Sequence, residues 1–365
     1  MAESTEPVSD GASSGPEPQY VDWAFAKATG RRLVNPGPIV STHEAADIVG
    51  RLREVAVAAR EPIATTSRLT SPEGVSPVLI VDRPGWIDAN VDSLQSLMGP
   101  VIAKVASGAK NPQSATVTAI GSKVTGAEAG ALMSFLASKV LGQYDLAPQA
   151  TPRLLLVAPN IVQTERELDV DPHDFRLWVA MHEETHRVQF TAVPWLREHL
   201  VVRTRELSTD LAPTASELAD RIHEIARRLP QAFQPGSQGL GEVFLTSAQK
   251  EKVAQITAIM SLLEGHADVM MDDVGPRVIP TVAEIRTKFQ KRRGGTGAMD
   301  RLIRRALGFE AKMRQYRDGA VFVRGVVDRV GLDDFNAVWT SPQTLPTPEE
   351  IARPATWIER VHGRS

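Results

Sequence analysis

The sequence predicts a mainly helical α+β fold, in which a pair of helices carries the functional site and a small β-sheet lies beside it. Long stretches of the chain have the apolar spacing and the capping residues of helices. Only two short apolar runs have the length and the flanking prolines of strands. The chain has 365 residues, 42% of them hydrophobic, so it has enough apolar side chains for a large buried core. Its formal charge of −3 is that of an ordinary globular protein.

The chain is expected to consist of a tail and one domain. Residues 1–19 are acidic, small and rich in proline, and they lack the basic and apolar segments of a secretory signal. We therefore expect a disordered tail and a cytoplasmic protein. No later Ser/Gly/Pro stretch is long enough to be a linker, so residues 20–360 are expected to form a single domain. The most apolar later window, 130–142, is too short to span a bilayer, and no membrane partner is expected.

Two helices are predicted in the N-terminal part of this domain. The stretch 41–61 starts with a capping box at Ser41 and ends before a proline. The stretch 125–142 starts with the same kind of box at Thr125 and ends on Gly142. Two glycines four residues apart within it leave a flat patch, where another backbone can approach closely. We expect the second helix to belong to the core.

Strands are predicted at 77–86 and 153–162, two short apolar runs that close with proline-containing turns. A polar connection at 163–171 leads from the second run into a further helix. Residues 197–246 look like an insertion, with a capped helix at 214–229 and a Gly/Pro/Gln loop at 231–242. Such a segment either lies over a site or is a surface excursion without a role.

The helix that follows the polar connection contains the sequence VAMHEETHRVQF. Asp171 at the N-cap position and the proline after it mark its start. Residues four apart on a helix lie about 40° apart and one turn along the axis, so His182 and His186 face the same point in space. Glu183 is rotated by about 100° from His182 and lies beside that point without having to ligate an ion there. This is the geometry of an HExxH metal site.

A solvated polar helix face is the alternative interpretation of this motif. The residues around the motif are apolar on nearly all sides, which predicts a buried helix. Buried imidazoles and carboxylates need partners, and a bound ion supplies them.

A third ligand is expected from a second helix. The sequence contains no cysteine, so a metal must be held by His, Asp, Glu or water, and two histidines leave a tetrahedral zinc one protein ligand short. The apolar helical segment 247–274 contains Glu264, which can complete the set. One turn later on the same face, Asp268 can accept the free ring N–H of a zinc histidine and fix its tautomer.

The motif HExxH followed by ExxxD resembles the gluzincin branch of the zincin metallopeptidases. That resemblance implies the same roles for Glu264 as third ligand and for Asp268 as the group that orients a ligand histidine. The segments VDRPGWIDAN, VLGQYDL, LLEGHAD, MRQYRDGAVFVRGVVDRVG and FNAVWTSPQTLP resemble more particularly an actinobacterial family of zincin-like hydrolases. Some members are described as associated with the biosynthesis of coenzyme F420. These segments are spread over most of residues 20–360.

Several other residues are candidates for lesser roles. Peptide hydrolysis needs a donor that stabilises the oxyanion, and Tyr316 and Tyr144 are the candidates; each is otherwise a half-buried ring. By helical geometry His266 faces away from the ion, and the remaining weak candidates are surface or core histidines, namely His173 and His199.

Residues 288–317 hold ten Lys or Arg against two acidic residues. Without interleaved aromatic residues or a DNA-reading motif, this stretch is interpreted as a solvated helix face, and no nucleic-acid partner is expected.

The sequence thus predicts a hydrolase with one Zn²⁺ that cleaves a peptide or another amide, with Glu183 as the general base. Two alternatives stay open. In one, the same ligands tie two helices together in a non-catalytic zinc-binding or interaction protein; in the other, no metal binds.

Overall fold

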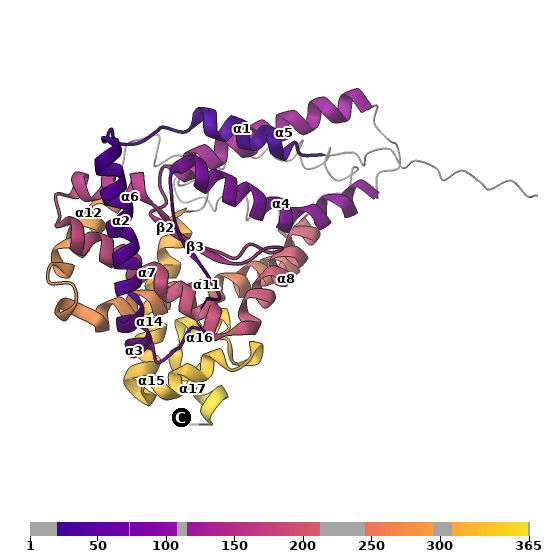
Figure 1. Ribbon diagram of the computed structural model, residues 1–365. Coiled ribbons are helices and arrows are strands. Elements are labelled where there is room, and N and C mark those ends of the chain that lie inside the picture. Colours follow the sequence, from indigo (N-terminus) through magenta and orange to yellow (C-terminus); the bar gives the residue numbers. More distant parts are fainter. Residues whose placement is uncertain (1–19, 73, 108–114, 212–244, 295–308, 364–365) are drawn as a thin grey trace, which may run out of the picture.

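The structure is a computed structural model that describes residues 20–72, 74–107, 115–211, 245–294 and 309–363 (Figure 1). Within these ranges the side chains of residues 105–107, 115–119, 293–294 and 309–317 are not described. The predicted tail, most of the predicted insertion, and the side chain of Tyr316 therefore lie outside the described part of the chain.

The described residues form many helices and a few short strands. The helices are α1 (Trp23–Leu33), α2 (Thr42–Ala58), α3 (Arg60–Ser67), α4 (Arg83–Ser107), α5 (Ala115–Ala137), α6 (Ala158–Leu168), α7 (Pro172–Ala192), α8 (Pro194–Leu211), α11 (Ser247–Val274), α12 (Val282–Gly294), α14 (Phe309–Val330), α15 (Leu332–Phe335), α16 (Pro348–Ala352) and α17 (Pro354–His362). The strands are β1 (Val78–Val81), β2 (Gly142–Asp145) and β3 (Arg153–Val157). This composition confirms the predicted fold class, mainly helical with a small sheet.

The sheet has the strand order β1-β3-β2, with β1 parallel and β2 antiparallel to β3. Because successive side chains of a strand point to opposite faces, Leu154 and Leu156 of β3 enter the larger apolar core, together with residues of α7. Leu155 and Val157 enter a smaller core with residues of α1 and α4. The sheet therefore separates two cores.

The helices are arranged around this sheet in layers. Helices α4, α1 and α5 pack on the side of the smaller core, and α7 and α2 pack on the other side. Helix α11 packs against α7, and α14 packs against α11, so that the C-terminal helices lie at the opposite end of the molecule from α5 (Figure 1). The contact between α7 and α11 is the one that matters for the site.

Glycines allow close contacts between helices. The predicted flat patch on α5 is confirmed, because a Cβ added at Gly130 would lie 2.4 Å from the Ala26 carbonyl oxygen of α1. A second crossing, between α11 and α14, is tighter. A Cβ at Gly265 would lie 2.1 Å from the Gly319 carbonyl carbon, and a Cβ at Gly319 would lie 1.8 Å from the Ser261 carbonyl oxygen. Only glycine fits at these positions.

Several predicted boundaries are wrong. Thr125 is not a helix start: it lies inside α5, and its hydroxyl donates to the Gly121 carbonyl at 3.1 Å. Helix α5 ends at Ala137, and Gly142 belongs to strand β2, which the sequence pattern did not predict. The polar connection at 163–171 is largely helix α6. The prolines after β1 and β3 begin helices rather than turns, because the first helical turn tolerates proline.

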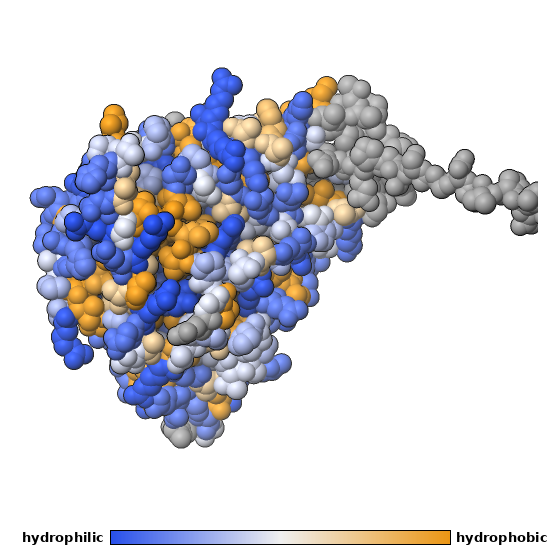
Figure 2. All heavy atoms as spheres, in the orientation of Figure 1, coloured by the Kyte–Doolittle hydropathy of each residue, from blue (hydrophilic) through white to orange (hydrophobic). Residues whose placement is uncertain are grey.

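The start of the predicted insertion is part of the packed structure. Residues up to Leu211 belong to α8, which contacts α11 and α4, and residues 212–244 are outside the described part. On the face seen in Figure 2, hydrophobic residues form patches that hydrophilic residues interrupt. Among the described helices, none combines the length and the apolar composition that crossing a membrane requires.

Candidate metal centre

Between its two ends, helix α7 is buried except for one stripe. Its start agrees with the prediction, since the Asp171 side chain accepts from the backbone N–H of Asp174. Between positions 174 and 191, every residue is buried except four that are four positions apart, namely Trp178, His182, His186 and Phe190. The solvated-face interpretation of the motif is therefore wrong. The two histidines lie in the middle of the only partly exposed line on an otherwise buried helix.

Three side-chain atoms converge on this stripe. The Nε2 atoms of His182 and His186 lie 3.3 Å apart. Each lies 3.5 Å from Oε2 of Glu264 on α11, although 78 residues separate His186 from Glu264 in the sequence. The three groups form a set of possible ligands, while their side chains remain 25%, 13% and 14% exposed. Helix packing, rather than sequence proximity, assembles this set.

The spacing of these atoms fits a tetrahedral ion. A zinc ion with bonds of about 2.0 to 2.1 Å keeps its ligand atoms about 3.3 to 3.4 Å apart, close to the observed separations. Oε2 of Glu264 is buried and has no hydrogen-bond partner among the described residues. A buried carboxylate oxygen without a partner is costly, and a cation coordinated between the three atoms removes that cost. The residues present therefore fit a zinc ion.

The charges around the three atoms favour the same arrangement. Burial opposes ionisation of Glu264, but the nearby imidazoles outweigh it and hold the pKa of Glu264 well below its usual range. Burial also opposes protonation of His186, yet Glu264 raises the pKa of His186 to about 9. Without a metal ion, the Glu264 carboxylate is thus negatively charged, and a protonated His186 ring supplies the positive charge that balances it.

Glu183 lies next to this set and against the edge of the sheet. It is 7% exposed, and burial raises its pKa above the usual range of a carboxyl group. A Cβ added at Gly142 of β2 would lie 2.5 Å from Cγ and 2.8 Å from Oε1 of Glu183. The missing side chain at Gly142 is therefore what leaves room for the Glu183 carboxylate.

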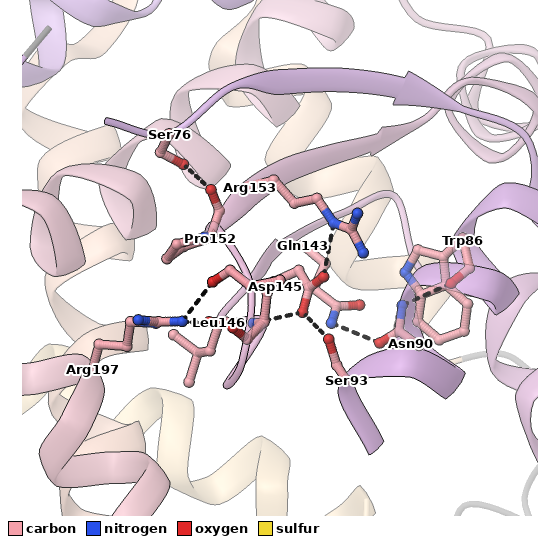
Figure 3. A network of polar contacts seen from close by, with 12 residues as sticks. Ser76, Trp86, Asn90, Ser93, Gln143, Asp145, Leu146, Pro152, Arg153 and Arg197 are labelled. Atoms are coloured by element: carbon pink, nitrogen blue, oxygen red, sulfur yellow. Dashed lines mark hydrogen bonds and ion pairs between the residues drawn. The ribbon is translucent and has the colours of Figure 1, made fainter. Parts of the chain in front are cut away.

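A network of polar contacts holds β2 in this place (Figure 3). The Asp145 carboxylate is 2% exposed and accepts from Ser93 of α4 at 2.6 Å and from Arg153 of β3 at 3.0 Å. The Gln143 amide donates to Asn90 of α4 at 2.8 Å. Because alternate side chains of β2 are tied to α4 on one face, Gly142 is fixed toward α7 on the other face.

Gln189 is a site residue that the sequence analysis missed. It lies three positions after His186 on α7 and is fully buried. Its Oε1 lies 3.0 Å from Nδ1 of His186. Its Nε2 donates to the Leu263 carbonyl at 2.9 Å and lies 2.9 Å from Nδ1 of His266. The spacing HxxQ is the signal that would have found it, because residues three apart are neighbours on a helix.

The remaining candidates are distributed over several elements. His266 does not converge with the metal-binding atoms, in agreement with the prediction; it is fully buried, and burial lowers its pKa to about 3, so it is neutral. Tyr144 on β2 stacks on Phe190 with ring centroids 5.2 Å apart. His199 on α8 packs edge-on against Trp195, and His173 is exposed.

Asp268 and Tyr316 keep the status of sequence predictions. Asp268 lies one turn after Glu264 on α11, half-buried, and its backbone carbonyl accepts from Arg286 at 3.3 Å. The backbone of Tyr316 belongs to α14, and its side chain lies outside the described residues. At the start of the basic stretch, Lys288 and Arg292 form ion pairs with acidic neighbours.

Comparisons with known proteins identify the family of the chain. A sequence profile of a zincin-like metallopeptidase family matches residues 21–358, and the chain belongs to that family. A solved structure from Chloroflexus aurantiacus, described as a candidate hydrolase with a novel fold, is similar to the chain with a TM-score of 0.67 and 28% identity. The similarity covers 94% of this chain and 100% of that one. No curated protein sequence matches. The family and this neighbour together identify the class of protein as a hydrolase, and the family implies a zinc cofactor.

Proposed function

We propose that the protein is a zinc-dependent peptidase, with His182, His186 and Glu264 as the metal ligands. The observation that carries the proposal is the convergence of three ligand atoms at the spacing of a tetrahedral ion. One of the three, Oε2 of Glu264, is buried and has no hydrogen-bond partner among the described residues. Three protein ligands leave one position of a tetrahedral ion for water or substrate, which is typical of a catalytic rather than a structural zinc. A bound zinc ion would polarise the attacking water and the scissile carbonyl.

Glu183 is the proposed general base and acid. It takes a proton from the attacking water and later gives that proton to the leaving amine. A carboxyl group in water is too acidic to hold a proton between these two steps, and burial raises the pKa of Glu183 in the direction that the task requires. Gly142 leaves the carboxylate free to reach the reacting atoms.

A peptide is the proposed substrate because of the neighbouring strand. β2 lies at the edge of the three-stranded sheet. The N–H of Val157 donates to the carbonyl of Leu141, so the hydrogen-bonding groups of Gly142 and Tyr144 point away from β3, toward the open edge. An extended peptide can pair with such an edge, and β2 lies directly beside Glu183. The aromatic rings of Trp178 and Phe190, at the two ends of the exposed stripe, favour apolar groups on either side of the scissile bond.

Metal analysis together with a cleavage assay tests this proposal. The zinc content of the wild type, His186→Ala and Glu183→Gln is measured by mass spectrometry, and each protein is then incubated with a peptide library. His173→Ala is the matched control, because His173 lies exposed at the start of the same helix. We expect about one zinc ion in the wild type, Glu183→Gln and His173→Ala, and none in His186→Ala.

Cleavage is expected only from the wild type and His173→Ala. Removing Glu183 is expected to lower the rate by about 10²- to 10⁴-fold, the usual contribution of a general base. Zinc without cleavage by the wild type would support the alternative, in which the ligands tie α7 to α11 without catalysis. A wild type that binds no zinc after reconstitution would refute the metal site itself.

A further inference from the structure

Among the described residues, the polar partners of the Gln189 amide are His186 and two residues beside Glu264. Gln189 is 0% exposed, so its side chain must be satisfied by the protein. Its oxygen faces Nδ1 of His186 at 3.0 Å, and its nitrogen faces the Leu263 carbonyl and Nδ1 of His266, each at 2.9 Å. Leu263 and His266 flank the third ligand, Glu264, on α11. A single side chain thus joins a ligand histidine on one helix to the neighbours of the other ligand on the second helix.

The Leu263 carbonyl sets the polarity of this chain of contacts. A backbone carbonyl can only accept a hydrogen bond, so it requires the NH₂ end of the Gln189 amide. The oxygen end then faces His186, which must donate from Nδ1. The proton of the neutral ring is thereby placed on Nδ1, and Nε2 of His186 keeps its lone pair toward Glu264 and His182.

The opposite amide orientation would disable the site. It would place the Gln189 oxygen against the Leu263 carbonyl oxygen, and its NH₂ group against His186. His186 would then have to accept through Nδ1 and carry its proton on Nε2, the atom that lies 3.5 Å from Glu264. A protonated Nε2 cannot bind a metal ion.

His266 completes the chain by accepting the second N–H of the amide. Its ring is fully buried and is held between two aromatic rings, stacked on Phe335 at 5.8 Å and edge-on to Trp339 at 5.3 Å. A ring fixed in this way presents Nδ1 to Gln189 in one direction only. The other nitrogen, Nε2, has no hydrogen-bond partner among the described residues, so the contact with Gln189 is the polar contact that the described structure gives this ring.

We propose that Gln189 and His266 are positioning residues, which hold the His186 imidazole with an unprotonated Nε2 aimed at the metal. The inference rests on the proposed function, because it requires that His186 binds a metal ion. It assigns a role to HxxQ on α7 and to LEGH on α11, whose histidine is then neither a ligand nor a mere core residue. Groups that orient a ligand histidine in this way strengthen metal binding without touching the ion.

Zinc affinity, measured by competition with a chromophoric chelator, tests the inference without any substrate. Gln189→Leu removes all three contacts at nearly constant volume, and we expect zinc binding to weaken by about 10- to 100-fold. His266→Phe removes one contact and leaves the Leu263 carbonyl in place, so we expect a loss of only about fivefold. The visible spectrum of the Co²⁺-substituted protein reports the ligand geometry, and we expect it to change in Gln189→Leu.

Gln249→Leu is the matched control. Like Gln189 of α7, Gln249 is a buried glutamine; it belongs to α11 and lies far along that helix from Glu264. Its side chain donates to the Asp210 carbonyl at 2.6 Å. We expect this variant to lower the melting temperature and to leave zinc affinity and the Co²⁺ spectrum unchanged. A purely structural role of Gln189 would give the same pattern as the control.

The outcomes separate the two proposals. Wild-type zinc affinity in Gln189→Leu, with His186→Ala unable to bind zinc, would overturn the positioning role and leave the metal site intact. Loss of affinity in Gln189→Leu without cleavage by the wild type would support the positioning role and refute the peptidase. A wild type that binds no zinc would overturn both.

Discussion

The close approach of Gly142 to Glu183 gives a prediction that separates catalysis from metal binding. Gly142→Ala adds one methyl group at a place where its carbon would lie 2.5 Å from Cγ, 2.7 Å from Cδ and 2.8 Å from Oε1 of Glu183. Carbon atoms in ordinary contact lie about 3.5 to 4.0 Å apart, so the Glu183 side chain has to move by about 1 Å. The network around Asp145 keeps the strand itself from yielding.

A displacement of this size has a large effect on a proton transfer. Misplacing a catalytic group by about 1 Å costs on the order of 10²-fold in rate. The three atoms nearest to the added methyl group all belong to Glu183 and none to a metal ligand, so zinc content is expected to stay at the wild-type value. The assay compares kcat/KM for a peptide selected from the library, zinc content by mass spectrometry, and the melting temperature.

Gly50→Ala is the control for a glycine replacement as such. Nothing lies within 4 Å of a Cβ at Gly50, which is part of α2, so activity should be unchanged and stability should rise by about 0.5 to 1 kcal/mol. Full activity of Gly142→Ala with a full complement of zinc would refute the reasoning, because Glu183 would then not need the space at Gly142. Loss of zinc in this variant would also contradict it, since the strand would then have moved the metal ligands.

Two further predictions concern the helix crossing and the protonation of the site. Gly319→Ala places a methyl group 1.8 Å from the Ser261 carbonyl oxygen. We expect this variant to lower the free energy of unfolding in urea by about 3 kcal/mol or more. Gly121→Ala, which has open space around the added methyl group, should be neutral or stabilising. Equal stability of the two variants would contradict the tight crossing. Zinc binds His186 only when Nε2 of its ring is unprotonated. In the metal-free protein burial lowers the pKa of His186, but Glu264 outweighs burial and raises that pKa to about 9. Zinc affinity should therefore rise about tenfold per pH unit up to about pH 9. Protonated His186 also stabilises the metal-free protein: this contribution is complete below the ordinary histidine pKa of 6.5 and should disappear as the pH rises to about 9. Thermal unfolding of chelator-treated protein at several pH values measures it. A pH-independent zinc affinity would show that no proton leaves the site.

The fold class and the two site helices follow from local sequence patterns. Caps, prolines and apolar spacing are properties of neighbouring residues, and they predicted α7 from Asp171 onward and α11 over residues 247–274. The i, i+4 geometry of a helix is enough to place His182 and His186 on one line. The need for a third ligand pointed to Glu264 on the second helix, and the family resemblance implied the same role. The structure brings the Glu264 carboxylate to 3.5 Å from both rings. The link to coenzyme F420 remains an expectation from that resemblance.

The contacts that complete the site depend on tertiary structure. Gly142 looked like the end of a helix, because a glycine after an apolar run is the same local signal whether a strand or a turn follows. Its role depends on which helix packs against that strand. Gln189 and His266 lie 77 residues apart, and their contact exists only because α7 and α11 meet at one register. The close crossing of α11 with α14 at Gly265 and Gly319, next to Glu264, likewise exists only because these two helices meet at one register. Short-range spacing determines which side chains share a helix face, whereas long-range packing decides which faces meet and which atoms meet there.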